Sequence, residues 1–464
     1  MESAYQQNDL IQALSTARGR GAIAVIRSSG EGCIEAISRL FSKPDILRAS
    51  EGYRVHHGWI IDADAKKVDE VLVTIFREPN SYTGEDSVEI SCHGGLAVVD
   101  RVMDLLRSEG FRDAAPGEFT FRAFIAGKMD LTQAEAVREI VDARTDRIRS
   151  LAASQLSGSL SSAIDTVKNL IKHQAATAAL ALDYPEDETE ELRFDYQAIQ
   201  QARDELLKLI GTWRTGKLYR EGLTVTIVGP VNAGKSSLFN LFLREERSIV
   251  AEHPGTTRDW LEAWLSLDGI PMKLVDTAGL RRDSNDPVEI EGMRRTRKLL
   301  AGSDFILVVA DGIEGEKAAM ELEEEEMVSL LEDGAELPLA DRLIRVWNKA
   351  DIAPVAPVGW IPVSATRGMG FSELEAELRS RGHGGAAPEA DAPVINSMRQ
   401  KNLLERAAAA LNRFSPYSTE SDSVPVDLLA EDLHDALDAL GEITGSVTRV
   451  DVLNTLFSEF CVGK

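Results

Sequence analysis

The sequence predicts a multidomain fold in which an α+β domain is followed by an all-helical domain, and an α/β domain is inserted into the helical one. Three observations lead to this fold class. The chain has 464 residues, 44% of them apolar, which is too long for one ordinary core. Apolar residues recur at helical spacing both before and after a central stretch. Within that stretch strand-like and helix-like runs alternate, which is typical of doubly wound α/β domains.

The N-terminal part of the chain mixes strand-like and helical runs. Three segments, Ala22–Arg27, Val68–Phe76 and Ser87–Ser91, are rich in β-branched residues and partly alternate between apolar and polar. A further segment, Val98–Glu109, has helical spacing and stops at Gly110. This combination predicts a small α+β domain.

Helical spacing covers residues 131–182 and 191–217, and the alternating α/β pattern that follows ends near Arg381. A Gly/Ala/Pro-rich linker, Gly382–Pro393, separates that pattern from a last helical stretch. Because the two ends of a domain often lie close together, one domain can be inserted into another. The predicted segments are 1–127 (α+β domain), 128–218 (first helical part), 219–382 (inserted α/β domain) and 383–464 (second helical part).

Composition excludes several classes of protein. The net charge, 51 − 76 = −25, argues against a general nucleic-acid coat, because binding phosphates needs clustered Lys and Arg. The three cysteines, Cys33, Cys92 and Cys461, form neither a disulfide framework nor a zinc-binding pair, which favours a reducing cytoplasm. The polar N-terminus is unlike a signal peptide, and the lack of a run of about 18 apolar residues predicts no membrane span.

A phosphate-binding loop follows the strand-like run Leu223–Val228. Residues 229–236, GPVNAGKS, match the pattern G-x-x-x-x-G-K-[ST], and an apolar helix begins at Ser237. Glycines let the backbone N–H groups close around phosphates, Lys235 would contact the β- and γ-phosphates, and Ser236 would bind Mg²⁺. A P-loop (Ras-like) nucleotide domain is therefore predicted.

Three further elements select guanine and complete the site. Asp276 to Gly279 (DTAG) follows a strand-like run, so the acid can hold Mg²⁺ through water. Asp351, in the motif NKAD, can accept hydrogen bonds from the guanine N1–H and amino group, which adenine does not offer. The amide of Ala365 would meet the guanine carbonyl oxygen. The predicted GTP contacts are Asn232, Ala233, Gly234, Lys235, Ser236, Ser237, Ala251, Glu252, His253, Pro254, Gly255, Thr256, Thr257, Asp276, Thr277, Ala278, Gly279, Asn348, Lys349, Asp351, Ser364 and Ala365.

The residues that would carry out hydrolysis differ from those of many small GTPases. Leu280 stands where a glutamine positions the attacking water in those enzymes. The candidates to replace this glutamine are acids downstream: Asp283, Asp286, Glu289 and Glu291. Taken singly, each of them is more simply explained as an exposed surface acid. Asn232 could ligate a monovalent cation or stabilise the phosphate loop by hydrogen bonding. The sequence favours neither role over the other. Thr257, in HPGTTRD, could complete the coordination of magnesium.

In these motifs and in others outside the G domain, the chain resembles the MnmE (TrmE) family of tRNA-modification GTPases nearly from end to end. GPVNAGKSSLFN, GTTRD, DTAGLR and NKAD are shared with many GTPases. The N-terminal segments PNSYTGED–SVEISCHGG and APGEFTFRAFIAGKMDLTQAEA, and the terminal sequence FCVGK, are specific to the family.

The resemblance implies a homodimer whose GTP hydrolysis is activated by potassium when the G domains meet. Carried over by position, the potassium ligands are Asn232, the carbonyls of Ala251 and His253, and Thr256. Magnesium would take Ser236 and Thr257. The water-positioning glutamate falls on Glu289, with Glu291 as the alternative because this chain has one extra residue in that stretch. His253 and Pro254 depart from the commoner residues of that loop.

The resemblance also implies that the N-terminal domain mediates dimerisation and binds a tetrahydrofolate one-carbon derivative, such as 5-formyl- or 5,10-methylene-tetrahydrofolate. The residues implied to hold it are Arg27, Glu89, Lys128 and Lys464, and Cys461 could join the chemistry or simply pack. The implied reaction places an aminomethyl or carboxymethylaminomethyl group on carbon 5 of the wobble uridine of certain tRNAs. A flavin-containing partner, MnmG, would complete a heterotetramer.

Two other interpretations remain at this point. A ribosome-assembly GTPase shares the G-domain motifs, but it predicts an appended RNA-binding module or a second GKS motif, and the sequence contains neither. A nucleotide-controlled scaffold predicts GTP binding without turnover, which the leucine at position 280 leaves open.

Overall fold

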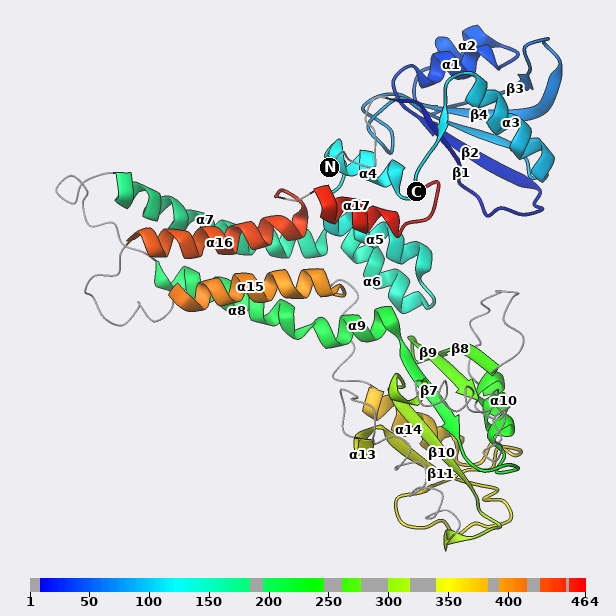
Figure 1. The fold of residues 1–464 in the computed structure, drawn as a ribbon, viewed down its shortest axis with the longest axis vertical. Coiled ribbons are helices and arrows are strands. Elements are labelled where there is room, and N and C mark those ends of the chain that lie inside the picture. Colours follow the sequence, from blue (N-terminus) through cyan, green and yellow to red (C-terminus); the bar gives the residue numbers. More distant parts are fainter. Residues whose placement is uncertain are drawn as a thin grey trace, which may run out of the picture. The chain divides into compact units, whose positions relative to one another are not determined.

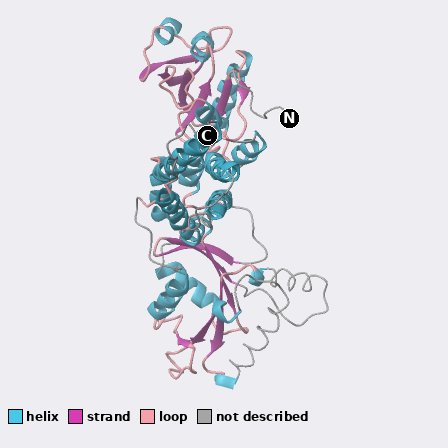
Figure 2. Cartoon of the chain, turned by 90° about the vertical axis from the view of Figure 1, so that its left-hand side faces the viewer, coloured by secondary structure: helices cyan, strands magenta, loops and turns pink. Residues whose placement is uncertain are grey.

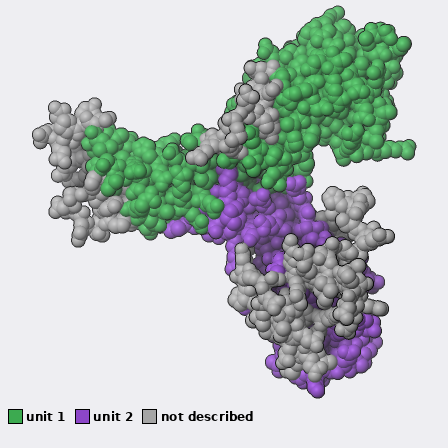
Figure 3. All heavy atoms as spheres, in the orientation of Figure 1, with its two compact units in different colours: residues 1–141, 155–206, 402–464 green, residues 142–154, 207–401 purple. Residues whose placement is uncertain are grey.

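The computed structural model describes residues 9–183, 195–245, 261–276, 299–317, 339–382, 392–414, 426–447 and 450–464 (Figure 1). Within these residues the strands form two six-stranded sheets, drawn in magenta in Figure 2. The chain forms two compact units, coloured separately in Figure 3, and each unit is assembled from separate stretches of sequence. The first comprises residues 1–141, 155–206 and 402–464, and the second comprises residues 142–154 and 207–401.

The N-terminal sheet belongs to the first unit. Its strand order is β3-β4-β5-β2-β1-β6, and all neighbours are antiparallel except β1 and β6. In β4, alternate residues Asp69, Val71, Val73 and Ile75 are buried, so one face of the strand meets the core as its alternating sequence predicts. The strands are β1 (Ile11–Leu14), β2 (Ile23–Ser29), β3 (Arg54–Ile61), β4 (Lys67–Phe76), β5 (Ser87–His93) and β6 (Arg112–Asp113).

Helices cover the inner face of this sheet. In α3 (Leu96–Ser108), Val99, Val102 and Leu106 are buried at helical spacing and join a core with β2, β4 and β5. The helix is followed at Gly110 by a left-handed backbone angle, φ 97°, which glycine adopts without strain. The predicted boundary at Gly110 is confirmed. The other helices here are α1 (Cys33–Arg39), α2 (Pro44–Arg48) and α4 (Glu118–Ile125).

An ionic cluster with two buried members, Glu118 and Arg122, joins the start of the described chain to α4. Arg112 contacts Asp9 and the fully buried Glu118, at 2.5 and 2.6 Å. Arg122, also buried, contacts Asp9 at 2.5 Å and Glu85 at 3.1 Å. Burial raises the pKa of Asp9, but the two arginines outweigh it, so that its pKa lies below its ordinary value. The cluster therefore fixes the loop that contains Glu85 against α4.

The helical part of the chain contains more breaks than the periodicity predicts. The predicted run 131–182 is three helices, α5 (Leu131–Asp142), α6 (Asp146–Leu156) and α7 (Ser159–Asp183), and Gly158, with φ 95°, separates the last two. α16 (Val426–Thr444) packs along α7 (Figure 1), and the buried Lys168 of α7 donates a 2.7 Å hydrogen bond to Thr444. The remaining helices are α8 (Tyr196–Gly211), α9 (Trp213–Glu221), α15 (Met398–Phe414) and α17 (Val450–Ser458). Among the described residues, no helix has both the length and the apolar character that crossing a membrane requires.

The second unit contains the inserted α/β domain. Its sheet has the order β12-β11-β10-β7-β9-β8, parallel throughout except for β8. The carboxyl ends of β7, β9, β10 and β11 consequently share one edge, where ligands bind in open α/β sheets. The strands are β7 (Leu223–Val228), β8 (Leu261–Leu267), β9 (Ile270–Asp276), β10 (Phe305–Asp311), β11 (Leu343–Asn348) and β12 (Ile361–Pro362), and the helices include α10 (Lys235–Glu245), α13 (Leu339–Arg342) and α14 (Phe371–Gly382).

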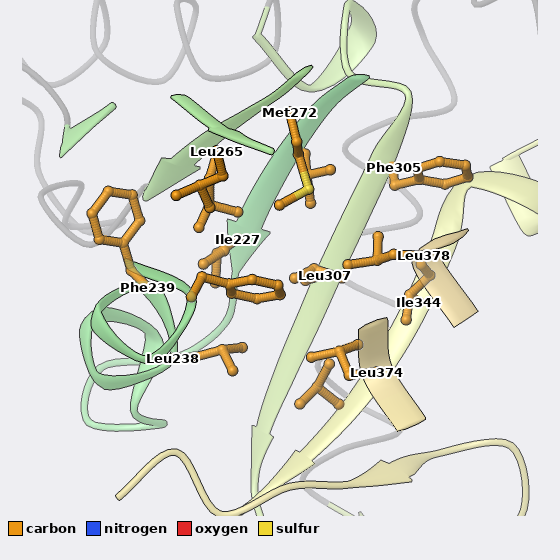
Figure 4. Close-up of a cluster of buried hydrophobic side chains, with 14 of the residues drawn as sticks. Ile227, Leu238, Phe239, Leu265, Met272, Phe305, Leu307, Ile344, Leu374 and Leu378 are labelled. Carbon is orange, nitrogen blue, oxygen red and sulfur yellow. The ribbon is translucent and has the colours of Figure 1, made fainter. Parts of the chain in front are cut away.

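The core of this domain lies between the sheet and the helices on one face. Figure 4 shows Leu238 and Phe239 of α10 beside Ile227 of β7, and Leu374 of α14 toward Leu307 of β10. Burial of each such side chain contributes about 1.5–3 kcal/mol. The central strand β7 is buried on both faces, because Val228 joins a second cluster on the other face. This packing fixes the end of β7, from which the phosphate loop leaves.

Candidate functional site

The phosphate loop needs glycine at two positions. Gly229 has φ 149°, and a Cβ there would lie 2.3 Å from the carbonyl oxygen of Val309. Gly234 has φ 92°, and a Cβ there would lie 2.1 Å from Nδ2 of Asn348. Both backbones approach their neighbours too closely for any side chain. The loop thus lies directly against β10 and β11, and α10 begins immediately after it with its N-terminus toward the loop.

Two side chains of the loop have the positions that phosphate and magnesium require. Lys235 Nζ donates to the carbonyl oxygens of Gly229 and Pro230, both at 2.8 Å, so the ammonium lies within the curve of the loop. Ser236 Oγ donates to Asp276 Oδ2 at 2.9 Å, and this acid is buried at the end of β9. Oxygen ligands of this kind, a hydroxyl beside a carboxylate, fit Mg²⁺.

Asn348 connects the phosphate loop to the guanine side of the site. Its Nδ2 donates to the carbonyl oxygen of Ala233 at 2.7 Å, and its Oδ1 accepts from the N–H of Ala365 at 3.1 Å. The side chain is only 2% exposed. Both ends of the amide are used, so Asn348 holds two predicted contact loops at a fixed separation. The N–H of Ala365, predicted to meet the guanine carbonyl oxygen, donates to Asn348 in this structure.

The guanine-side acid and lysine have partners that sequence reasoning missed. Asp351 is 3.3 Å from the guanidinium of Arg367, and Lys349 Nζ lies 2.5 Å from Asp311 Oδ2. The available signals were weak: Asp311 ends an apolar strand and precedes Gly312, and Arg367 follows the Ser364–Thr366 loop by one residue. Neither position belongs to a nucleotide-binding motif.

Asn232 is exposed and has φ 67°, a left-handed angle that asparagine tolerates better than most residues. That geometry fits both a loop-stabilising and a cation-binding role. The other predicted potassium ligands, and the switch and catalytic residues, lie outside the described residues and remain predictions. They are Ala251, Glu252, His253, Pro254, Gly255, Thr256, Thr257, Thr277, Ala278, Gly279, Glu289 and Glu291.

A second candidate site is on the N-terminal sheet. Arg27 and Glu89 face each other across β2 and β5, and two guanidinium nitrogens of Arg27 donate to Glu89 Oε1 at 3.0 and 2.9 Å. The same guanidinium lies 5.3 Å from the centre of the Tyr82 ring and 5.8 Å from that of Phe119. A charged pair flanked by rings can recognise a flat heterocycle with polar edges.

The C-terminal tail reaches this pair. Arg27 Nη1 donates to the carbonyl oxygen of Gly463 at 3.3 Å, and Ser15 Oγ donates to the same oxygen at 3.4 Å. Gly463 has φ 93°, and a Cβ there would lie 2.9 Å from the carbonyl oxygen of Leu14. Phe460 is buried, whereas Cys461 is exposed. The tail therefore places Lys464 one residue from the Arg27 contact.

Lys128 reaches the same region by another route. Its Nζ donates to the carbonyl oxygen of Pro79 at 2.8 Å, and a Cβ on Gly84 would lie 3.8 Å from its side chain. The loop from Pro79 to Gly84 includes Tyr82, whose ring contacts Arg27. The structure thus joins Arg27, Glu89 and the tail directly, and relates Lys128 to them through this loop.

Comparisons with known proteins match the whole chain. Residues 10–128 match the family model for the GTP-binding protein TrmE N-terminus, and residues 131–461 match that for the MnmE helical domain. The protein of Treponema denticola named tRNA modification GTPase MnmE is 39% identical over 473 residues, covering 99% of both chains. Proteins of the same name from Carboxydothermus hydrogenoformans (40%, 98% of this chain and 99% of the relative) and Enterococcus faecalis (38%, 100% of both) agree.

The chain belongs to the MnmE family of tRNA modification GTPases.

Membership of the MnmE family confirms the predicted fold class: a TrmE-type N-terminal domain, an MnmE helical domain and a P-loop G domain. It also confirms that this chain is a GTP-binding GTPase in tRNA modification. A ribosome-assembly GTPase is excluded, because the matching relatives cover the entire chain and not the G domain alone.

Proposed function

We propose that this MnmE-family GTPase uses GTP hydrolysis to drive a conformational cycle, while a one-carbon unit bound at the N-terminal domain enters the tRNA product. The observation that carries the GTP part is the contact of Ser236 with Asp276, which joins the phosphate loop to the strand leading into the DTAG motif. In the proposal, segments 1–127, 128–218, 219–382 and 383–464 are the folate-binding, first helical, G and second helical parts.

At the nucleotide site, backbone N–H groups of the phosphate loop and Lys235 would bind the β- and γ-phosphates. Ser236 and Thr257 would hold Mg²⁺, with Asp276 reaching it through water, and the metal would offset charge on the phosphates. Asp351 would accept hydrogen bonds from guanine. Asn348 would hold the loop that contains Ala365 at a fixed distance from the phosphate loop.

Potassium would be held by Asn232, Thr256 and the carbonyls of Ala251 and His253, and would stabilise charge between the phosphates in place of an arginine. Glu289 would orient the attacking water. The support is family membership together with the leucine at position 280.

Hydrolysis measured in potassium and in sodium tests this directly, because the proposal requires faster turnover in potassium. Equal, negligible rates in both salts would reject the potassium-dependent mechanism. Glu289→Ala should lower turnover and leave GTP affinity nearly intact, whereas the same phenotype in Glu291→Ala would move the assignment to that residue.

Arg27, Glu89, Lys128 and Lys464 would hold the tetrahydrofolate derivative. The guanidinium and ammonium groups suit its carboxylates, and Glu89 suits an amine edge of the pterin. Their support is the cluster of Arg27, Glu89 and Gly463 within hydrogen-bond distance.

Calorimetric titration with 5-formyltetrahydrofolate should show binding that Arg27→Ala weakens. Arg54→Ala is the matched control, because Arg54 is an exposed arginine that pairs only with the exposed Glu51 among the described residues. Absence of binding by the intact chain would reject the folate assignment.

The product is proposed to be the aminomethyl or carboxymethylaminomethyl group on carbon 5 of the wobble uridine, formed in the cytoplasm by a homodimer together with FAD-containing MnmG. Cys461 is exposed, and its carbonyl oxygen accepts a 3.3 Å hydrogen bond from the N–H of Lys464, so a role for its thiol in the chemistry is part of the proposal. Nucleoside analysis of tRNA from a deletion strain tests the proposal, and unchanged wobble uridines would contradict it.

A further inference from the structure

We propose that Asp311 is a positioning residue for guanine recognition, which acts by holding the ammonium of Lys349. The proposal rests on the GTP site described above and deepens it. It assigns a role to a residue outside the four nucleotide-binding motifs.

The carboxylate of Asp311 is fixed at the edge of the sheet. Asp311 is the last residue of β10 and pairs in register with Asn348, the last residue of β11. Its Oδ1 accepts from the N–H of Ile313 at 3.0 Å, and its Oδ2 accepts from Lys349 Nζ at 2.5 Å. The side chain of Asp311 is only 9% exposed, so its carboxylate is largely shielded from water. Two donors and a strand end leave this carboxylate little freedom to move.

The backbone at Lys349 is held in a conformation that needs support. Its backbone φ is 63°, in the left-handed region that residues with a Cβ rarely adopt. Its carbonyl oxygen accepts from the N–H groups of Ile352 and Ala353, at 2.9 and 3.0 Å. With the carbonyl held at one end and the ammonium at the other, the whole residue is fixed.

The turn after Asp311 packs on the same loop. The N–H of Gly312 donates to the carbonyl oxygen of Asn348 at 3.0 Å. A Cβ on Gly312 would lie 2.7 Å from that oxygen and 2.8 Å from Nε1 of Trp347. The pair Asp311–Gly312 therefore braces the start of the segment that ends at Asp351.

These contacts have a consequence for binding. Lys349 is a predicted GTP contact two residues before the guanine-binding Asp351, so its hydrocarbon stem would lie on the guanine ring. An unanchored lysine would lose its rotational freedom only when the base binds. Anchoring the ammonium on Asp311 removes most of that loss before binding. Losing the anchor should weaken guanine nucleotides by about three- to tenfold, the range expected for one immobilised long side chain.

The test measures GDP and ADP affinities of the full-length chain. Wild type should prefer GDP. Asp311→Asn keeps the shape and the acceptor for Ile313 but removes the charge, and Lys349→Met keeps the stem but removes the ammonium; each should weaken GDP about three- to tenfold. The double variant should be no weaker than the weaker single variant, since both changes break one contact. Glu314→Gln, an exposed acid on the same turn, is the control and should bind as wild type does.

Different failures have different meanings. A wild type without preference for GDP over ADP would reject the guanine site and this proposal with it. A wild type that prefers GDP, with losses in the two single variants that simply add in the double variant, would reject only the role of Asp311 through Lys349. Should Asp311→Asn fail to fold, unchanged GDP affinity in Lys349→Met would reject the proposal by itself.

Discussion

Truncating Asn348 gives the most direct test of how the nucleotide site is held together. Asn348→Ala would leave the carbonyl oxygen of Ala233 and the N–H of Ala365 without the partners they have at 2.7 and 3.1 Å. Both groups belong to buried residues, and each buried polar group that loses its partner costs about 1–3 kcal/mol. The cost to the assembled site is therefore about 2–6 kcal/mol, with the lower end applying if water enters.

Equilibrium titration with a fluorescent GDP derivative measures this loss, because nucleotide binding must restore the arrangement that Asn348 holds. A loss of about 2 kcal/mol corresponds to roughly thirtyfold weaker binding. Asn348→Asp should bind GDP no better than the alanine variant, since an oxygen in place of Nδ2 would face the Ala233 carbonyl oxygen. The exposed Asn402→Ala is the control. Binding by Asn348→Ala within about threefold of wild type would refute the bridging role.

Four further outcomes are expected. In the native protein a thiol reagent at neutral pH should modify only the exposed Cys461, because burial raises the pKa of the other two thiols, that of Cys92 to about 11, and keeps them protonated; denaturation should expose all three. Phe457→Ala should destabilise the first unit by about 3–5 kcal/mol, seen as a lower melting temperature, since the side chain is fully buried. Asp9→Asn should lower stability above pH 3.8, where the carboxylate with its depressed pKa is charged, and the difference from wild type should shrink as pH falls below that value. Arg144→Ala should speed hydrogen exchange in the β8–β9 hairpin, because the guanidinium lies 3.5 Å from the Trp264 ring centre.

The local sequence pattern was sufficient to predict those helices and strands that depend mainly on residues close together in the sequence. The run Leu223–Val228 with the glycine-rich loop after it predicted β7 and the start of α10, because strand, turn and helix signals are contiguous. The strands containing Val68–Phe76 and Ser87–Ser91 were predicted for the same reason. Helix breaks at residues 143–145 and at Gly158 were missed, since apolar spacing continues through both.

Contacts between distant segments could not be derived from pattern. Arg27 and Gly463 are 436 residues apart, and only the family resemblance related the tail to the N-terminal sheet. Asp311 and Lys349 are 38 residues apart and meet because β10 and β11 are adjacent and in register. Before the strand order is known, an acid that ends one strand cannot be assigned to a lysine that follows another.

One strand of the G domain, β9, contacts the phosphate loop at one end and the start of α6 at the other. β9 ends at Asp276, which contacts Ser236, and begins next to Gly269, whose carbonyl oxygen accepts a 2.7 Å hydrogen bond from Thr145 Oγ1. Gly269 has φ 86°, and a Cβ there would lie 3.1 Å from Arg147, so the contact is close. β9 lies between β7 and β8, and it pairs with β7 through residues 272–276 and with β8 through residues 270–276. One paired strand therefore connects the contact between Asp276 and the phosphate loop with the contact between Gly269 and Thr145, the residue that directly precedes α6.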